Sequence, residues 1–284
     1  MSYSIDKKKF ICKLAHSREL VITEDPIIMA ILNLTPDSFS DGGKYQTNEE
    51  ALHQALLFEQ QGAGIVDIGG ESTRPGAIPI DYNEEIRRIL PVIKILSKKT
   101  NVIISVDTYN AQTARFAIDA GAHIINSVKG LTLELAEVVK EKNAAIIVMH
   151  NSWHEQDDDI DVMQRVNRFF NKSLEIAQKY HIAKDKIILD PGFGFGKNEA
   201  ENFSLMKNFT EFKQWGYPLL IGVSRKRFLG ALCKSQDFAS RDNLTAMASG
   251  LLYLQGANIV RVHNVLITME SLLLAKAFKD GNIY

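Results

Sequence analysis

The sequence predicts a single (β/α)8 barrel, an α/β fold in which eight parallel strands alternate with eight helices. Short apolar runs rich in Val and Ile recur eight times along the 284 residues, and segments with helical periodicity lie between them. Strands that alternate with helices indicate βαβ units and a parallel sheet. Strands that are apolar throughout suit a sheet buried on both faces. The length also agrees, because such barrels typically have about 250 residues.

The predicted elements follow one another in strict alternation. The strands are expected at residues 27–32, 65–68, 102–106, 123–128, 145–149, 187–189, 219–223 and 259–262. The helices are expected at residues 49–61, 84–98, 111–120, 133–142, 162–180, 204–215, 241–255 and 265–279. A doubly wound sheet is the rival fold, but it usually carries a Gly-rich turn after its first strand. Here that turn begins Asn33-Leu34-Thr35-Pro36, so the barrel is favoured.

The residues before the first barrel strand form an extension. Residues 10–22, "FICKLAHSRELVI", predict a short β-hairpin placed under the barrel as a plug. We therefore expect one domain over residues 1–284, with an N-terminal extension at 1–25 and the barrel at about 26–280.

Composition and charge exclude several classes of protein. The chain is 45% hydrophobic and 24% charged, with a net charge of -1, so no basic field for nucleic acid or an anionic membrane is expected. No apolar run reaches the roughly 18 residues that span a bilayer, and no apolar stretch of signal-peptide type follows Lys7-Lys8-Lys9. The only two cysteines, Cys12 and Cys233, lie far apart and predict neither a disulfide framework nor a metal cluster. The expected location is the cytoplasm.

Polar side chains gather where the predicted strands end. They are Asn33, the segment 69–74, Asp107, Asn126, Met149-His150, Asp190, Ser224-Arg225-Lys226, Arg261 and His263. In a barrel the carboxyl ends of all strands meet at one rim, which is where barrel enzymes place their sites. One charged residue at a strand end is ordinarily a structural salt bridge. Many strands that end this way indicate a functional site.

These residue types define the ligand that the rim would suit. Asp107, Asn126 and Asp190 offer hydrogen-bonding groups for a planar molecule with N–H donors. Arg74, Lys226, Arg261 and His263 would grip an anion of high charge, such as a phosphate. Asn33 and the acids of the following loop carry oxygens that suit Mg2+. A Schiff-base role for Lys226, as in barrel aldolases, remains an alternative.

Seven motifs in this order resemble the dihydropteroate synthase family. They are "ILNLTPDSFSDGG", "DIGGESTRPGA", "SVDTY", "IIN", "DPGFGFGKN", "GVSRK" and "RVHNV", and they span roughly residues 27–264. The resemblance implies a pterin-binding barrel that joins 6-hydroxymethyl-7,8-dihydropterin diphosphate to p-aminobenzoate. The products would be 7,8-dihydropteroate and pyrophosphate, in folate biosynthesis. It also implies assistance by Mg2+, competition by sulfonamides and, with the apolar last helix, a homodimer.

The resemblance assigns roles to individual residues of this chain. Catalysis falls to Asp107, Lys226, Arg261 and His263. Pterin binding falls to Asp107, Asn126, Met149, Asp190 and Lys226, and diphosphate binding to Asn33, Arg74, Arg261 and His263. The p-aminobenzoate pocket would contain Phe39, Thr73, Pro75, Phe195, Ser224 and Lys226, and Mg2+ would be held by Asn33 and Asp41. Two loops, 35–43 and 69–76, would close over the substrates and exclude water.

The expected chemistry is an SN1-like loss of diphosphate, followed by attack of the neutral amine on a pterin-stabilised cation. Three residues depart from the family pattern: Ala30 replaces a common Gly, Ser127 follows Asn126 where many members have Asp, and Asn264 follows His263 where others have Asp. Each lies beside a predicted ligand without replacing one. Two alternatives remain open. One is a pterin-binding methyltransferase of the same fold, and the other is a paralogue that binds pterin without catalysis.

Overall fold

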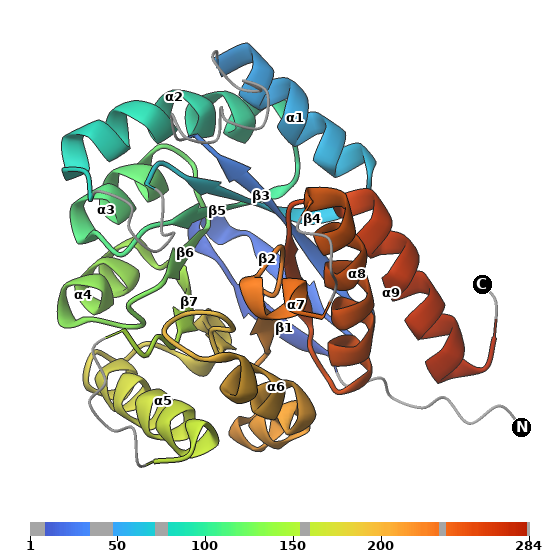
Figure 1. Ribbon diagram of the computed structural model, residues 1–284. Coiled ribbons are helices and arrows are strands. Elements are labelled where there is room, and N and C mark those ends of the chain that lie inside the picture. The colour runs from blue at the N-terminus through green and yellow to red at the C-terminus, as the bar shows by residue number, and fades with distance from the viewer. Residues whose placement is uncertain (1–8, 35–47, 72–78, 154–159, 233–236, 283–284) are drawn as a thin grey trace, which may run out of the picture.

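The computed structural model describes residues 9–34, 48–71, 79–153, 160–232 and 237–282. Within these ranges eight parallel strands form one sheet in the order β8-β7-β6-β5-β4-β3-β10-β9. A parallel bridge between Leu189 and Leu219 joins the two outer strands, so the sheet closes into a barrel (Figure 1). The strands are β3 Ile27–Asn33, β4 Ala63–Gly69, β5 Ile103–Asp107, β6 Ile124–Ser127, β7 Ala145–Met149, β8 Ile187–Asp190, β9 Leu220–Ile221 and β10 Ile259–Val262. The predicted barrel is confirmed.

Helices surround the sheet on the outside (Figure 1). They are α1 Asn48–Gln60, α2 Tyr82–Lys99, α3 Ala111–Asp119, α4 Leu133–Lys142, α5 Val162–Lys179, α6 Glu199–Lys207, the short α7 Arg227–Gly230, α8 Phe238–Leu254 and α9 Val265–Asp280. In the described part of the chain, no helix combines the length and apolar character needed to cross a membrane.

Two predicted elements differ from the structure. The helix expected at 204–215 is divided into α6, which begins earlier, and a 3-10 helix, η4, at Phe209–Trp215. Asn198 and Glu201 form a capping box that fixes the start of α6, and this S/T/N-x-x-E type of pattern is a strong helix start signal. The strand expected at 219–223 is reduced to Leu220–Ile221, with Leu219 in an isolated bridge before it and a turn at 224–225 after it.

The hairpin forms as predicted, with β1 at Phe10–Lys13 and β2 at Glu19–Ile22. Its inward side chains, Cys12, Leu14, Leu20 and Ile22, are buried in one cluster with Met29, Ile65 and Ile103. The latter three lie at or near the amino-terminal parts of barrel strands. The hairpin therefore closes the end of the barrel opposite the polar rim. A second, larger apolar cluster fills the layer between strands and helices.

Candidate functional site

Strand register brings predicted site residues from neighbouring strands together. Asn33 of β3 pairs with Gly69 of β4, and Gly69 pairs with Asp107 of β5. Asp107 in turn pairs with Asn126 of β6. On the far side of the barrel, Met149 of β7 pairs with Asp190 of β8. The structure thus places these polar strand ends on one rim.

Arg261 forms the centre of this rim. Its Nε donates to Asp67 Oδ2 at 2.6 Å, and its Nη2 donates to Asp107 Oδ2 at 2.7 Å. Asn126 Nδ2 donates to the same Asp67 oxygen at 2.9 Å. The Asp67 side chain is fully buried, whereas Arg261 keeps 18% of its side-chain surface exposed. The Arg261 guanidinium therefore joins β10 to β4 and β5, and the Asp67 carboxylate adds β6.

Asp67 is the site residue that the sequence interpretation missed. It lies inside β4, two residues before Gly69, in the run "IVDIGG". The available signal was a single acid within an otherwise apolar strand, because such a residue is costly to bury without a cationic partner. Asp67 lies one pleat deeper than the polar strand ends, on the same face of β4 as Gly69.

Asp190 is held by the glycine-rich loop that follows β8. Its Oδ1 accepts the Gly192 N–H at 2.7 Å. Gly192 has φ +69°, and a Cβ there would lie 1.8 Å from the His150 carbonyl oxygen. The positive φ and this close approach explain why glycine is needed at that position. The first glycine of the motif thus fixes the turn that brings a backbone N–H to Asp190.

Lys226 lies beside that loop, with its Nζ 3.7 Å from the centroid of the Phe195 ring. Phe195 belongs to a small buried apolar cluster with Val128 and Met149, against which Tyr109 packs. This geometry is a cation–π contact at the edge of an apolar wall. The rim therefore joins a flat apolar surface to charged groups, as a planar polar ligand would require.

His263 and Ser224 connect the ends of β10 and β9. The Ser224 hydroxyl lies 2.8 Å from His263 Nδ1 and accepts the His263 backbone N–H at 3.1 Å. The Ser224 hydroxyl accepts the backbone N–H, so the hydroxyl hydrogen is free to be donated to His263 Nδ1. In a neutral ring the proton then lies on Nε2. The imidazole is thus orientated by a predicted site residue.

Burial shifts the pKa of three charged groups in the site. Desolvation raises the pKa of Asp107 to about 7, although Arg261 acts in the opposite direction. Desolvation also raises the pKa of Asp190 to about 6, with the Gly192 N–H opposing it. Desolvation and the nearby Arg261 lower the pKa of Lys226 to about 7, although Asp190 and Asp107 oppose them. Clustered shifts of this kind are typical of functional sites.

Unused hydrogen-bonding atoms remain in the centre of the site. Asp107 Oδ1 is buried and has no partner within the described residues. Arg261 uses Nε and Nη2 in its two ion pairs, which leaves Nη1 for a ligand. A ligand that brings N–H donors to the carboxylates and an anion to the guanidinium would satisfy both.

The predicted site residues Phe39, Asp41, Thr73, Arg74 and Pro75 lie outside the described residues. Asn33, one of the two predicted Mg2+ ligands, ends β3 at the rim. A Cβ at Gly69 would lie 3.4 Å from Asn33 Oδ1. Glycine at this position therefore leaves the space beside the Asn33 side chain open. The Asn33 side-chain oxygen beside the predicted diphosphate site fits Mg2+, because this ion is usually coordinated by few protein oxygens together with water and phosphate. Among the described residues no cluster of three or more His, Cys, Asp or Glu could hold a metal.

Comparison with known proteins supplies the family. Residues 29–263 match the family model described as pterin binding enzyme. Dihydropteroate synthase of Escherichia coli is 40% identical over 258 residues, covering 89% of this chain and 91% of that protein. A Clostridium difficile dihydropteroate synthase, solved in the presence of pteroic acid, has a TM-score of 0.85 at 39% identity and covers 89% of this chain and 97% of that one. A Xanthomonas albilineans dihydropteroate synthase with 4-aminobenzoic acid has a TM-score of 0.87 at 36% identity, with coverage of 96% and 98%.

Proposed function

The chain belongs to the dihydropteroate synthase family of pterin-binding enzymes, and from this premise we propose that it makes 7,8-dihydropteroate. The substrates are 6-hydroxymethyl-7,8-dihydropterin diphosphate and p-aminobenzoate, and pyrophosphate is released. The observation that carries this proposal is the buried constellation of Asp107, Asn126 and Asp190 around Arg261. It offers acceptors for the pterin and a cation for the diphosphate in one water-poor site.

The pterin ring would bind across the carboxyl ends of β5, β6, β7 and β8. Asp190 would accept its amino and ring N–H groups, because a carboxylate can receive two parallel hydrogen bonds. Asp107 Oδ1, which is buried without a partner in the described residues, would receive a further N–H. Met149 supplies an apolar wall, and Lys226 lies on the carbonyl side of the ring.

The diphosphate would bind on the other half of the rim. Arg261 and His263 of the β10 end provide cationic or N–H groups, and Asn33 adds its amide. Arg74 and the second metal ligand, Asp41, complete this set from segments outside the described residues. Mg2+, when bound beside Asn33, would neutralise charge on the leaving diphosphate.

The p-aminobenzoate would enter beside Lys226 and Ser224. The Phe195 ring, already in contact with the Lys226 ammonium, would form one wall. Phe39, Thr73 and Pro75 would contribute the rest of the pocket. From this pocket the amine would approach the pterin methylene carbon.

The reaction begins with cleavage of the CH2–O bond, and the electron pair leaves with the diphosphate. Arg261 and His263 stabilise that charge, while Asp107 stabilises the positive pterin by its position rather than as a nucleophile. The neutral amine then attacks the methylene carbon to form the C–N bond, and its proton passes to the departed diphosphate or to bulk water. The protein supplies binding, orientation and exclusion of water, since water would also trap the cation.

The order of these steps can be measured by positional isotope exchange. With 18O in the bridging position and no p-aminobenzoate, an early departure of diphosphate should scramble the label between bridging and non-bridging oxygens. Scrambling occurs when the freed diphosphate rotates in the site before it recombines with the cation. Complete absence of scrambling, under conditions where added p-aminobenzoate gives turnover, would count against the early-leaving mechanism.

Pterin affinity should fall at acidic pH. Asp190 accepts N–H groups only as a carboxylate, and burial raises its pKa to about 6. Below that pH the carboxyl carries a proton and loses an acceptor, so affinity rises as the pH passes through about 6. Asp107, whose pKa burial raises to about 7, loses its acceptor in the same way and extends the rise to higher pH. We expect binding at least about tenfold weaker at pH 5 than at pH 7, measured by titration calorimetry with the protein shown to be folded at both values. Equal affinities would show that Asp190 does not titrate in this range.

Product identification tests the function against its rivals. The purified protein should convert the dihydropterin diphosphate, p-aminobenzoate and Mg2+ to a compound with the mass of dihydropteroate. A methyltransferase would instead transfer a methyl group from methyltetrahydrofolate and give no dihydropteroate. Saturable pterin binding with no product would identify a non-catalytic paralogue.

A homodimer is the assembly that the surface favours. Helices α8 and α9 pack against each other and expose Met247, Leu251, Leu273, Leu274 and Phe278, the last with 78% of its surface accessible. A patch from two adjacent helices of one chain can meet its own copy through a two-fold axis.

The free buried Cys12 and the absence of a basic field support a cytoplasmic enzyme that binds neither membrane nor nucleic acid.

Charge on that patch should separate the copies. Leu274→Glu places a carboxylate in the centre of α9 and should convert dimers to monomers in light scattering coupled to gel filtration. Leu133→Glu on α4, also at an exposed apolar position, is the matched control and should leave the dimer intact. A wild-type protein that is monomeric at micromolar concentration would refute the assembly.

A further inference from the structure

The segment Ser224-Arg225-Lys226 carries two proposed site residues with one residue between them that has no assigned role. Arg225 adopts a left-handed backbone conformation, with φ 57°. That region is uncommon for a residue with a side chain. The turn therefore needs support from outside, and Arg225 must be held for Ser224 and Lys226 to face the site.

Helix α8 provides that support through two side chains. Asp242 accepts two hydrogen bonds from the Arg225 guanidinium, from Nε at 2.8 Å and from Nη2 at 3.0 Å. Thr245, nearly one turn further along α8, accepts the Arg225 backbone N–H at 3.0 Å. The Asp242 side chain is 9% exposed, so the ion pair is well shielded from water. A bidentate pair fixes direction as well as distance.

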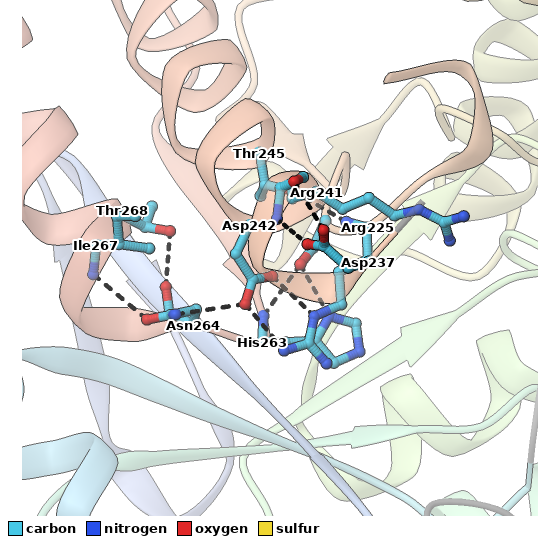
Figure 2. A network of polar contacts seen from close by, with 11 residues as sticks. Arg225, Asp237, Arg241, Asp242, Thr245, His263, Asn264, Ile267 and Thr268 are labelled. Carbon is cyan, nitrogen blue, oxygen red and sulfur yellow. Dashed lines mark hydrogen bonds and ion pairs between the residues drawn. The ribbon is translucent and has the colours of Figure 1, made fainter. Parts of the chain in front are cut away.

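Asn264 completes the arrangement on the other side of Asp242. Its Nδ2 donates to Asp242 Oδ2 at 3.4 Å, and its Oδ1 accepts the Ile267 N–H at the start of α9. Figure 2 shows the Asp242 side chain reaching from α8 toward Asn264 on one side and Arg225 on the other. A carboxylate at position 264 would face the Asp242 carboxylate at this separation. The neutral amide, which departs from the His-Asp pattern, therefore suits the acid at 242.

We propose that Asp242 is a positioning residue for catalysis, and that a carboxylate at position 264 can take over its place beside Arg225, because Arg225 Nη2 and Asn264 Nδ2 meet the same Asp242 oxygen. Through Arg225 the carboxylate sets the turn that points Ser224 to His263 and Lys226 over Phe195. This inference rests on the proposed function, because Ser224 and Lys226 are taken to line the p-aminobenzoate pocket.

A double-mutant cycle tests the exchange of the carboxylate. Asp242→Asn should lower kcat/KM for p-aminobenzoate about tenfold, mainly through KM. Pterin affinity should fall by less, about threefold, because Lys226 is the one pterin-binding residue on this turn, while Asp107, Asn126 and Asp190 hold the ring from β5, β6 and β8. Asn264→Asp alone should lower the thermal midpoint, because it places two carboxylates together. The double variant D242N/N264D restores one carboxylate beside Arg225 and should return kcat/KM to within about threefold of wild type. Glu270→Gln, which removes an exposed acid from α9, is the control and should behave as wild type.

Three outcomes would overturn the proposal. One is a D242N protein with wild-type kcat/KM and only a lower thermal midpoint, which would make the role structural. The second is a double variant as impaired as the product of the two single variants. The third is an equal loss of pterin and p-aminobenzoate affinity in D242N. If the wild type makes no dihydropteroate, the proposed function fails. The thermal midpoints of the same four proteins still show whether a carboxylate at position 264 replaces the one at position 242.

Discussion

Asp190→Asn should lower kcat/KM for the pterin substrate by roughly 100-fold to 1,000-fold, which corresponds to about 3 to 4 kcal/mol. The amide oxygen can still accept the Gly192 N–H, as Asp190 Oδ1 does at 2.7 Å. The amide nitrogen, however, replaces an acceptor with a donor and would oppose the N–H edge of the pterin. Charge-assisted hydrogen bonds are lost at the same time. Steady-state kinetics and direct pterin titration give the two readouts.

A matched substitution separates this effect from a general loss of charge. Asp185→Asn makes the same chemical change in η3, Lys184–Lys186, where Asp185 pairs with Lys13 at 3.5 Å at the hairpin end of the barrel. That variant should keep wild-type kinetics. A D190N protein that binds pterin within threefold of wild type would show that the ring edge lies elsewhere.

Arg261→Met should abolish turnover and lower the free energy of unfolding by about 3 to 5 kcal/mol at pH 8. The substitution leaves Asp67 and Asp107 buried without their shared cation. Burial raises the pKa of Asp107 to about 7 even beside Arg261. Without that cation the pKa of Asp107 rises further, so the neutral carboxyl is more populated in the folded variant. A folded-state pKa above the unfolded value makes stability greatest at low pH and lost as pH rises. The deficit relative to wild type should therefore be smaller at pH 5 than at pH 8.

Chemical denaturation at both pH values measures this deficit. Arg87→Met is the control, because Arg87 pairs with Glu84 on α2 with 74% of its side chain exposed. Such a surface pair contributes little, about 0 to 1 kcal/mol. Equal deficits for the two variants, or a deficit that grows toward pH 5, would contradict the assigned role of Arg261 as the shared cation.

The sequence predicted the barrel and most of the described rim because both depend on local patterns. Apolar strands alternate with helices, and Asn33, Asp107, Asn126 and Asp190 stand directly where strands end. In a closed parallel sheet that position alone places side chains on one rim. The contribution of each of these strands to the rim could therefore be predicted from its own residues, without knowing which strands lie beside it.

Two important residues could not be found in that way, because their roles arise from contacts between distant segments. Asp67 lies one pleat below its strand end. Its lone charge in an apolar strand indicates a buried partner, but that this partner is Arg261, 194 positions away, is evident only in the fold. Asp242 lies within α8 and carries no local signal at all. Its partner Arg225 is identified only when the turn before α7 packs against that helix. The boundary of α6 was misplaced for a different reason, since the capping box at Asn198 outweighed the periodicity further on.

The central claim is that this rim joins a pterin to p-aminobenzoate, and pyrophosphate release tests it most directly. The purified wild-type protein is supplied with dihydropterin diphosphate and Mg2+, first without and then with p-aminobenzoate. We expect sustained release only when both substrates are present, with one dihydropteroate formed per pyrophosphate. Release at the same rate without p-aminobenzoate, or no release in either case, would contradict it.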